Sequence, residues 1–238
     1  MKYCFIFFVC LISGNDMLAQ AQNEELFQNR TNNGFKDGFW RVKHKGTSID
    51  RYTGEFQMGV PKGVFKHYYS NGILRSAMYF KALSGECYVK NYNRKEKLIS
   101  EGKYLSKNVK DSIWKTYNEI GQIIISETWK KGNLEGLYKT YYSNGNVVES
   151  GIMNNAKKDG QWIRWSENGE KIRVSNYSDN ILNGKWIDYD VDGRVKMLGV
   201  YLNGYREGKW VFYNFGKPRK SIIFQKGREI NITEYYWH

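Results

Sequence analysis

The chain has 238 residues, a formal net charge of +13, only two prolines, and an aromatic content of 16%. Disordered chains are poor in aromatic side chains, so this composition excludes a disordered protein. The positive charge bears on solubility and on the kind of partner, not on the fold.

The N-terminus predicts a secretory signal peptide over residues 1–21. Lys2 is followed by an uncharged apolar run over residues 3–12, and Ala19–Ala21 fits the A-x-A pattern of a cleavage site. The run is too short to span a hydrocarbon core of about 30 Å. We therefore expect an exported protein, periplasmic or otherwise associated with the cell envelope, with an N-terminal linker over residues 22–33.

A repeat of about 24 residues fills the rest of the chain, over residues 34–238. In the clearest copies it begins at Gly136, Gly160, Gly184 and Gly208. A first aromatic residue lies two positions later in nearly every copy: Trp40, Phe65, Tyr88, Trp114, Tyr138, Trp162, Trp186 and Trp210. A second aromatic residue recurs five positions after the start, a turn glycine nine positions after it, and a third aromatic residue near position seventeen.

The turn dipeptides indicate how each repeat folds. Asn71-Gly72, Asn144-Gly145, Asn168-Gly169 and Asp192-Gly193 are favoured in type I′ hairpin turns, in which both central residues have positive φ. A lone hairpin is marginally stable, whereas stacked hairpins bury a continuous apolar face. The sequence therefore predicts an all-β protein, an elongated, twisted antiparallel sheet of about eight tandem β-hairpins.

The repeat does not decide the face on which each aromatic row lies. The first and second aromatic residues have opposite parity, so an ideal strand directs them to opposite faces. Either a bulge restores a common face, or one of the two rows faces solvent. The copy that begins at Glu86 is the weakest, because it lacks the turn glycine and has Asn91 in place of the second aromatic residue.

Residues 184–193 and 136–145 resemble the MORN-repeat variant of bacterial envelope proteins, and the resemblance extends over residues 34–238. It implies a ribbon of hairpins used for binding or scaffolding, and MORN proteins have been linked to membrane lipids and to protein partners. Some variant members carry the label of antitoxins. That label has little weight here, because an antitoxin should meet its toxin in the cytoplasm and this chain is predicted to be exported.

No residues have the pattern of a catalytic or metal site. His44, His67 and His238 lie in separate regions, and no cysteine–histidine cluster has the spacing of a zinc site. Cleavage leaves Cys87 as the remaining cysteine, and its place in a strand pattern indicates a buried structural thiol. We expect no enzyme activity and no cofactor.

Two candidate binding surfaces follow from the repeat. The central aromatic residues Trp162, Trp165, Trp186 and Tyr189 form a candidate contact surface. Lysines in the loops between hairpins form a candidate basic edge, represented by Lys130, Lys131, Lys157 and Lys158. The alternatives are that these aromatic residues form the core, and that the lysines only keep the sheet soluble and guard its edges.

The leading functional hypothesis is a non-enzymatic scaffold of the cell envelope that binds a protein or glycan. The alternative is a peripheral membrane protein that docks the basic edge on anionic lipid, with about 1 kcal/mol for each lysine near the bilayer. Interleaved tyrosine and lysine also resemble a stacking platform for nucleic acid, but export argues against that partner.

Overall fold

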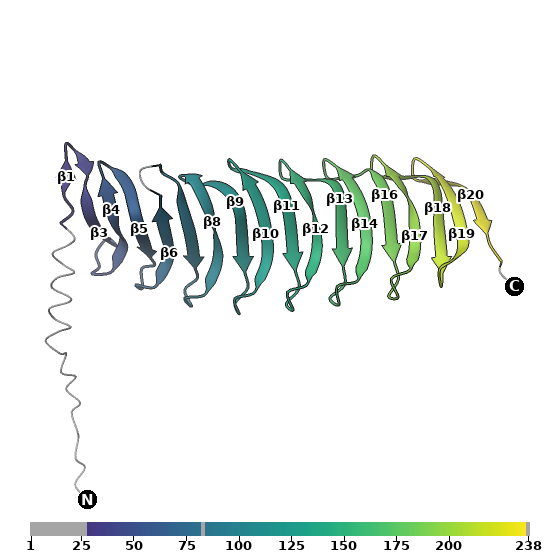
Figure 1. The fold of residues 1–238 in the computed structure, drawn as a ribbon, viewed down its shortest axis with the longest axis horizontal. Coiled ribbons are helices and arrows are strands. Elements are labelled where there is room, and N and C mark those ends of the chain that lie inside the picture. The colour runs from purple at the N-terminus through teal and green to yellow at the C-terminus, as the bar shows by residue number, and fades with distance from the viewer. Residues whose placement is uncertain (1–27, 82–83, 237–238) are drawn as a thin grey trace, which may run out of the picture.

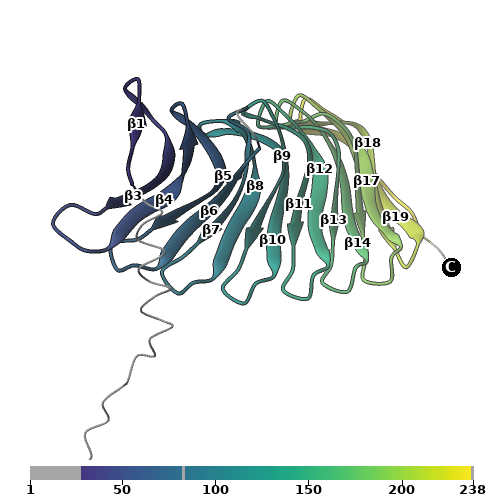
Figure 2. The same ribbon diagram turned by 60° about the vertical axis from the view of Figure 1, so that its left-hand side comes forward.

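The computed structural model describes residues 28–81 and 84–236, so the signal peptide predicted for residues 1–21 lies outside the described residues. The described chain is all-β, and the predicted elongated antiparallel sheet of tandem hairpins is confirmed. Figures 1 and 2 show the strands side by side along the long axis of the molecule. No helix in the described part of the chain is long and apolar enough to cross a membrane.

The strands are β1 (Thr31–Asn32), β2 (Phe35–Lys36), β3 (Gly38–Lys43), β4 (Asp50–Gln57), β5 (Val60–Tyr68), β6 (Leu74–Phe80), β7 (Cys87–Tyr92), β8 (Leu98–Ser106), β9 (Val109–Tyr117), β10 (Ile123–Lys130), β11 (Asn133–Tyr141), β12 (Val147–Asn154), β13 (Lys157–Trp165), β14 (Lys171–Ser178), β15 (Ile181–Leu182), β16 (Gly184–Tyr189), β17 (Val195–Leu202), β18 (Tyr205–Asn214), β19 (Lys217–Gln225) and β20 (Arg228–Glu234).

The strands of the main sheet follow one another in chain order, from β3 to β20. β15 and β16 both pair with β14 and share one place in the sheet. β3 and β20 lie at opposite ends, and no pairing joins them within the described ranges, so the sheet is open.

The N-terminal end of the sheet is covered by part of the predicted linker. Residues 28–33 include β1, which forms a small hairpin with β2. Asn29 Oδ1 accepts a hydrogen bond from the Arg41 N–H at 2.8 Å, and the Trp40 indole N–H donates to the Arg30 carbonyl at 3.1 Å. These residues therefore belong to the folded part of the chain.

The turns predicted as type I′ have a different geometry. At Asn71-Gly72 only the glycine has positive φ, at 84°. The Gly72 N–H donates to the Tyr69 carbonyl at 3.0 Å, and the Tyr69 N–H donates to the Ile73 carbonyl at 2.8 Å. This is a three-residue loop, a type I turn followed by a left-handed glycine. The type I′ prediction is therefore wrong here, because the loop has one residue more than that turn holds.

The same two hydrogen bonds recur in the other three turns predicted as type I′, which are Asn144-Gly145, Asn168-Gly169 and Asp192-Gly193. Turns with two left-handed residues occur instead at most of the described junctions between repeats. Asn203 and Gly204 have φ of 50° and 84° there. Because such a junction has only two residues between its strands, it is itself a hairpin turn, and the next repeat extends the same sheet.

Bulges shift the register within the hairpins without restoring a common face for the two aromatic rows. In β13, Trp162 pairs with Ser175 and Trp165 pairs with Lys171, and the extra residue, Ile172, lies in β14. Between Trp162 and Trp165, β13 has no extra residue against β14, so these two side chains lie on opposite faces. We call the face of Trp162 the aromatic face and the face of Trp165 the open face.

The aromatic face forms the core of this single-layer protein. Trp162 is 1% exposed and Trp210 is 0% exposed. Rings of neighbouring strands pack edge to face along the sheet: the centroid of Tyr201 lies 5.2 Å from that of Trp186 and 5.0 Å from that of Trp210. Such contacts add stability beyond the burial of area, so they join one repeat to the next.

Glycine makes room for the ring in every second repeat. A Cβ on Gly151 would lie 2.2 Å from the Trp162 indole, and a Cβ on Gly199 would lie 2.2 Å from the Trp210 indole. The Trp162 N–H donates to the carbonyl of Ile152, the residue after the glycine, at 3.2 Å. Gly54 and Gly102 lie in the same way beneath Phe65 and Trp114. The buried rings therefore rest directly on backbone of the preceding repeat.

The weakest repeat is displaced by one residue from the predicted register. Val89 is 3% exposed and takes the buried first position, whereas Tyr88 is 63% exposed. The repeat therefore begins at Cys87, which is itself buried, as predicted for a structural thiol. The prediction that it begins at Glu86 is wrong, because no glycine marks the start.

The corrected register restores the missing features of that repeat. Tyr92, not Asn91, is its second aromatic residue. Glu96 takes the place of the turn glycine, with φ of 60°, and its N–H donates to the Asn93 carbonyl at 3.1 Å. Its hairpin geometry therefore matches that of the other repeats.

Candidate binding surface

The predicted contact residues divide between the two faces. Trp162 and Trp186 are 1% and 9% exposed and belong to the core, so their prediction as contact residues is wrong. The physical reason is the neighbouring glycines and rings, which enclose the indoles. Trp165 and Tyr189 lie on the open face and are partly buried.

The lysines of the predicted basic edge lie close to acidic or aromatic groups. Lys130 Nζ is 2.9 Å from Glu135 Oε1, and Lys157 Nζ is 3.2 Å from Asp179 Oδ1. At Lys131 it is the backbone N–H, not the side chain, that donates to Asp111 Oδ1, at 3.2 Å. Exposed ion pairs contribute about 0–1 kcal/mol, but they lower the positive charge that this edge presents.

Lys158 belongs to the aromatic face. Its Nζ lies 2.9 Å from Glu149 Oε2 and 4.0 Å from the centre of the Trp162 ring. Basic residues stack in the same way on other core rings, with Lys110 over Trp114 and Arg206 over Trp210. Cation–π contacts of this kind hold the basic side chains against the core.

Three parallel rows of side chains run along the open face in the N-terminal repeats. Alternate residues of a strand share a face, so each first strand of a hairpin contributes an apolar, a basic and an aromatic side chain in that order. The sets are Val64, Lys66 and Tyr68 in β5; Tyr88, Lys90 and Tyr92 in β7; Ile113, Lys115 and Tyr117 in β9; and Leu137, Lys139 and Tyr141 in β11.

The basic residues of these strands form one continuous row. We call Lys66, Lys90, Lys115 and Lys139 the lysine row. Cross-strand pairs connect them through Ala77, Glu101 and Ser126. Successive lysines are two strands apart, which is about 9.6 Å at the usual strand spacing of about 4.8 Å.

Glu101 is the acidic member among these lysines. Its carboxylate oxygens lie 3.8 Å from Lys90 Nζ and 3.8 Å from Lys115 Nζ. It also accepts a hydrogen bond from the Tyr117 hydroxyl at 2.6 Å. Burial and this hydrogen bond to a carboxylate raise the pKa of Tyr117 to about 12. The row therefore keeps a net positive charge, with four lysines and one glutamate.

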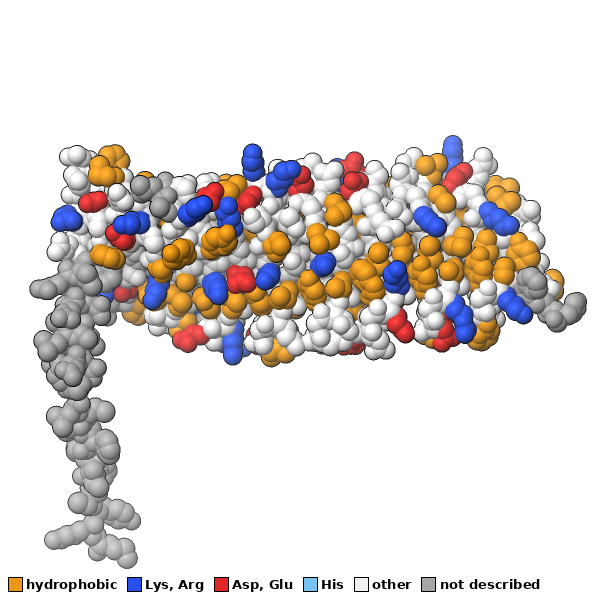
Figure 3. Space-filling model, viewed as in Figure 1, with side chains coloured by type: hydrophobic (Ala, Val, Ile, Leu, Met, Phe, Trp, Pro, Cys, Tyr) orange, Lys and Arg blue, Asp and Glu red, His pale blue; other side chains and the backbone are white. Residues whose placement is uncertain are grey.

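The apolar row beside the lysines is open to solvent. Val64, Tyr88, Ile113 and Leu137 are between 44% and 63% exposed, and Tyr79, opposite Tyr88, is 60% exposed. Figure 3 shows a band of hydrophobic side chains along most of the molecule, with lysine and arginine side chains beside it. Contiguous exposed apolar surface is typical of an interaction site.

The rows change character in the C-terminal repeats. Ile163, Ile187 and Val211 take the places of the lysine row, and Gln161, Lys185 and Lys209 take those of the apolar row. Val174 and Leu198 pair with these aliphatic residues on the strands between them. The aromatic row continues unchanged through Trp165, Tyr189 and Tyr213.

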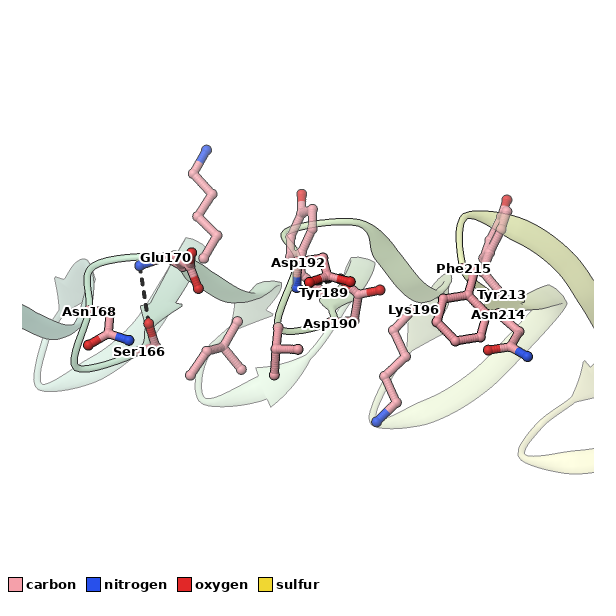
Figure 4. Close-up of a pocket in the computed structure, with 13 residues that line it drawn as sticks. Ser166, Asn168, Glu170, Tyr189, Asp190, Asp192, Lys196, Tyr213, Asn214 and Phe215 are labelled. Atoms are coloured by element: carbon pink, nitrogen blue, oxygen red, sulfur yellow. Dashed lines mark hydrogen bonds between the residues drawn. The ribbon is translucent and has the colours of Figure 1, made fainter.

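Grooves border the two predicted contact residues that lie on the open face. One, of about 780 Å³, is lined by turns of neighbouring hairpins and includes Tyr189, Tyr213 and Phe215 (Figure 4). A dashed line in Figure 4 marks the 3.2 Å hydrogen bond from the Glu170 N–H to Ser166 Oγ, which closes one of these turns. A second groove, of about 320 Å³, is lined by both Trp165 and Lys139.

The histidines and acidic residues do not gather into a metal centre. Among the described residues, no group of three or more His, Cys, Asp and Glu side chains is placed to hold a metal ion. His44 Nε2 is 3.1 Å from the Tyr68 carbonyl oxygen. Burial, and then the charges of Arg75 and Arg51, lower the pKa of His67 on the aromatic face. His238 lies outside the described residues.

The lysine row was not predicted, although its signal is present in the sequence. A lysine lies three positions after the start of four successive repeats once the third repeat begins at Cys87. In the predicted register Lys90 was displaced by one position, which interrupted the series.

Two segments of the chain, residues 61–82 and 134–155, match the family model described as the MORN repeat variant. The predicted resemblance to MORN-repeat proteins is thereby confirmed for these two segments. No curated protein matches the chain.

Solved structures share only weak similarity with this chain. A mutant of S. aureus TarM matches with 12% identity and a TM-score of 0.32, over 61% of this chain and 24% of TarM. TcdB2–TccC3 matches with 12% identity and a TM-score of 0.21, over 79% of this chain and 14% of its own. A porin-like protein from Bacteroides uniformis matches with 10% identity and a TM-score of 0.18, over 82% and 95%. The chain thus spans a quarter or less of the first two, and these TM-scores support no shared function.

Proposed function

We propose that this chain is a non-enzymatic binding or scaffolding protein of the cell envelope, and that it binds a protein or glycan through the open face. The observation that carries the proposal is the contrast between the two faces of one sheet. The aromatic face is closed by its own rings, as at Trp162, which is 1% exposed. The open face keeps an apolar row exposed beside a row of lysines.

The form of the surface supports binding along its length. Stacked repeats create extended surfaces on which neighbouring repeats present equivalent side chains. Here Val64, Tyr88, Ile113 and Leu137 occupy equivalent places on four first strands. A partner that contacts several of these side chains gains binding free energy from each contact, while the shape of the sheet stays the same.

Site-specific photo-crosslinking in cells tests which face meets the partner. A photoreactive residue replaces Ile113 on the open face or, as the control, exposed Arg164 on the aromatic face. We expect a reproducible adduct from position 113 and none from position 164. Equal adducts from both positions, or no adduct from position 113, would contradict binding through the open face.

Fractionation tests the location separately. We expect the mature protein in the envelope fraction, with an intact mass that corresponds to cleavage after Ala21. A full-length protein in the cytoplasm would contradict the envelope location.

Docking on anionic lipid through the basic edge is less favoured. Lys130, Lys157 and Lys158 each lie within 3.2 Å of a carboxylate oxygen, so much of the charge on that edge is already neutralised.

A further inference from the structure

We propose that the lysine row binds a linear acidic polysaccharide that lies across the strands, along the long axis of the sheet. This assignment rests on the proposed function, because it names the partner class of the open face. The polymer crosses β5, β7, β9 and β11, each of which supplies one lysine of the row.

The spacing of the charges fits a linear polymer with regularly repeated anions. The lysines recur at about 9.6 Å, one on every second strand. Small side chains, Ala77 and Ser126, lie in two of the three intervals between the lysines, and Glu101 lies in the third. In a polysaccharide built from a repeating disaccharide, a carboxylate or sulfate on every second ring recurs at a comparable distance.

The flanking side chains fit sugar rings. On β7, Lys90 lies between Tyr88 and Tyr92 on the same face, and Tyr88 pairs across strands with Tyr79. An aromatic ring offers an apolar surface against which the C–H face of a sugar ring packs, while the ammonium group meets the anion. The four strands repeat this order of apolar, basic and aromatic side chains.

A change of residue type defines the C-terminal end of the row. The four lysines span about 30 Å, from three intervals of about 9.6 Å. Beyond Lys139 the place of the row is taken by Ile163, and Trp165 and Lys139 line one groove at this end. A ligand therefore has to be long enough to reach several repeats.

An extended peptide fits the row less well. Its side chains return to one face every second residue, about 6.6 Å apart, so its acidic groups fall out of step with lysines about 9.6 Å apart. A bilayer fits less well because the cations form a line one residue wide, bordered by apolar Ile113 and partly buried Tyr117.

Binding of the mature full chain to immobilised polysaccharides tests the proposal. The probes are hyaluronan, chondroitin sulfate and polygalacturonate, with neutral dextran for comparison. We expect binding to at least one acidic polymer at physiological ionic strength, no binding to dextran, and loss of binding at high salt as exposed charges are screened. Absence of binding to all three acidic polymers overturns the proposal.

Two triple variants of equal charge separate the row from the overall charge of the chain. The row variant carries Lys66→Ser, Lys115→Ser and Lys139→Ser; the control carries Lys130→Ser, Lys131→Ser and Lys157→Ser at the edge. We expect the row variant to bind about tenfold more weakly or worse, and the control to stay within about twofold of the unmodified chain. Equal losses in both variants overturn the proposal. Thermal unfolding of both variants confirms that they are folded.

Other anionic partners are tested with the same variants. The probes are vesicles that contain phosphatidylglycerol and a single-stranded oligothymidylate. If either binds as tightly as the best polysaccharide and depends on the row, the surface is a lipid or nucleic-acid site and the polysaccharide proposal fails. If the polysaccharides fail but the adduct at position 113 persists, the open face still binds a partner and only the assigned class is wrong.

Discussion

The two faces of the sheet are built from the same strands but follow different patterns along the chain. On β13, Trp162 is enclosed by Gly151 and its neighbours, while the adjacent residue Ile163 lies on the open face. On the aromatic face, a glycine that makes room for a ring recurs in every second repeat along the whole sheet. These glycines are Gly54, Gly102, Gly151 and Gly199. The open face instead divides into an N-terminal block with lysines and a C-terminal block with aliphatic residues.

This difference separates packing from recognition. A buried ring fits only where the neighbouring strand leaves space for it. The sequence pattern of the aromatic face therefore depends on adjacent strands and repeats along the whole sheet. Many side chains of the open-face rows are exposed instead, as at Tyr88 and Ile113. They change between blocks without disturbing the core, so a binding surface can occupy one region of an otherwise uniform array.

The largest expected effect is on the aromatic face. Trp162→Ala should lower the free energy of unfolding by about 3–5 kcal/mol, because it empties a fully buried site. Trp165→Ala, on the open face of the same strand, should cost clearly less. Urea unfolding measures both, and equal losses would remove the distinction between the faces.

A second test concerns the glycine beneath the indole. Gly151→Ala should destabilise the fold by about 1–3 kcal/mol, because the added Cβ would lie 2.2 Å from the Trp162 ring. If the clash is the cause, combining it with Trp162→Phe should give a smaller loss than the sum of the two single losses. Strict additivity in urea unfolding would show that Gly151 acts in another way.

A third test adds lysines to the C-terminal block of the open face and measures whether binding increases. Ile163→Lys together with Ile187→Lys extends the lysine row into the C-terminal repeats. We expect affinity for a long acidic polysaccharide to rise by about threefold or more, since two further cations meet the polymer. Short oligosaccharides that already fit the four-lysine row should show little change. Unchanged affinity for the long polymer would show that the row does not act as a linear site.

The smallest expected effect is a pH dependence that arises on the aromatic face. The fold holds the pKa of His67 below 6.5, chiefly through burial, so it favours the neutral ring. As the pH falls below about 6.5 the unfolded chain takes up this proton first, and the folded state loses stability. His67→Gln should reduce the loss of stability between about pH 7 and pH 5. A variant with the same loss as the unmodified chain would show that His67 does not contribute.

Much of the fold was predictable from sequence because its signals are local and repeated. Glycine and aromatic residues recur at fixed places, and from them followed the all-β class, the number of hairpins and the buried Cys87. The turn type was not predictable in the same way. Asn-Gly is compatible with both a two-residue and a three-residue loop, and the bond from the Tyr69 N–H to Ile73 decides between them.

The sequence by itself determined that the first and second aromatic rows have opposite parity, since side chains alternate along a strand. Only the tertiary structure decided which row is buried, because the space for Trp162 comes from Gly151 on another strand. The lysine row depends on the tertiary structure for the same reason. Its members lie about one repeat apart in the chain, and strand pairing alone places them in one line on one face.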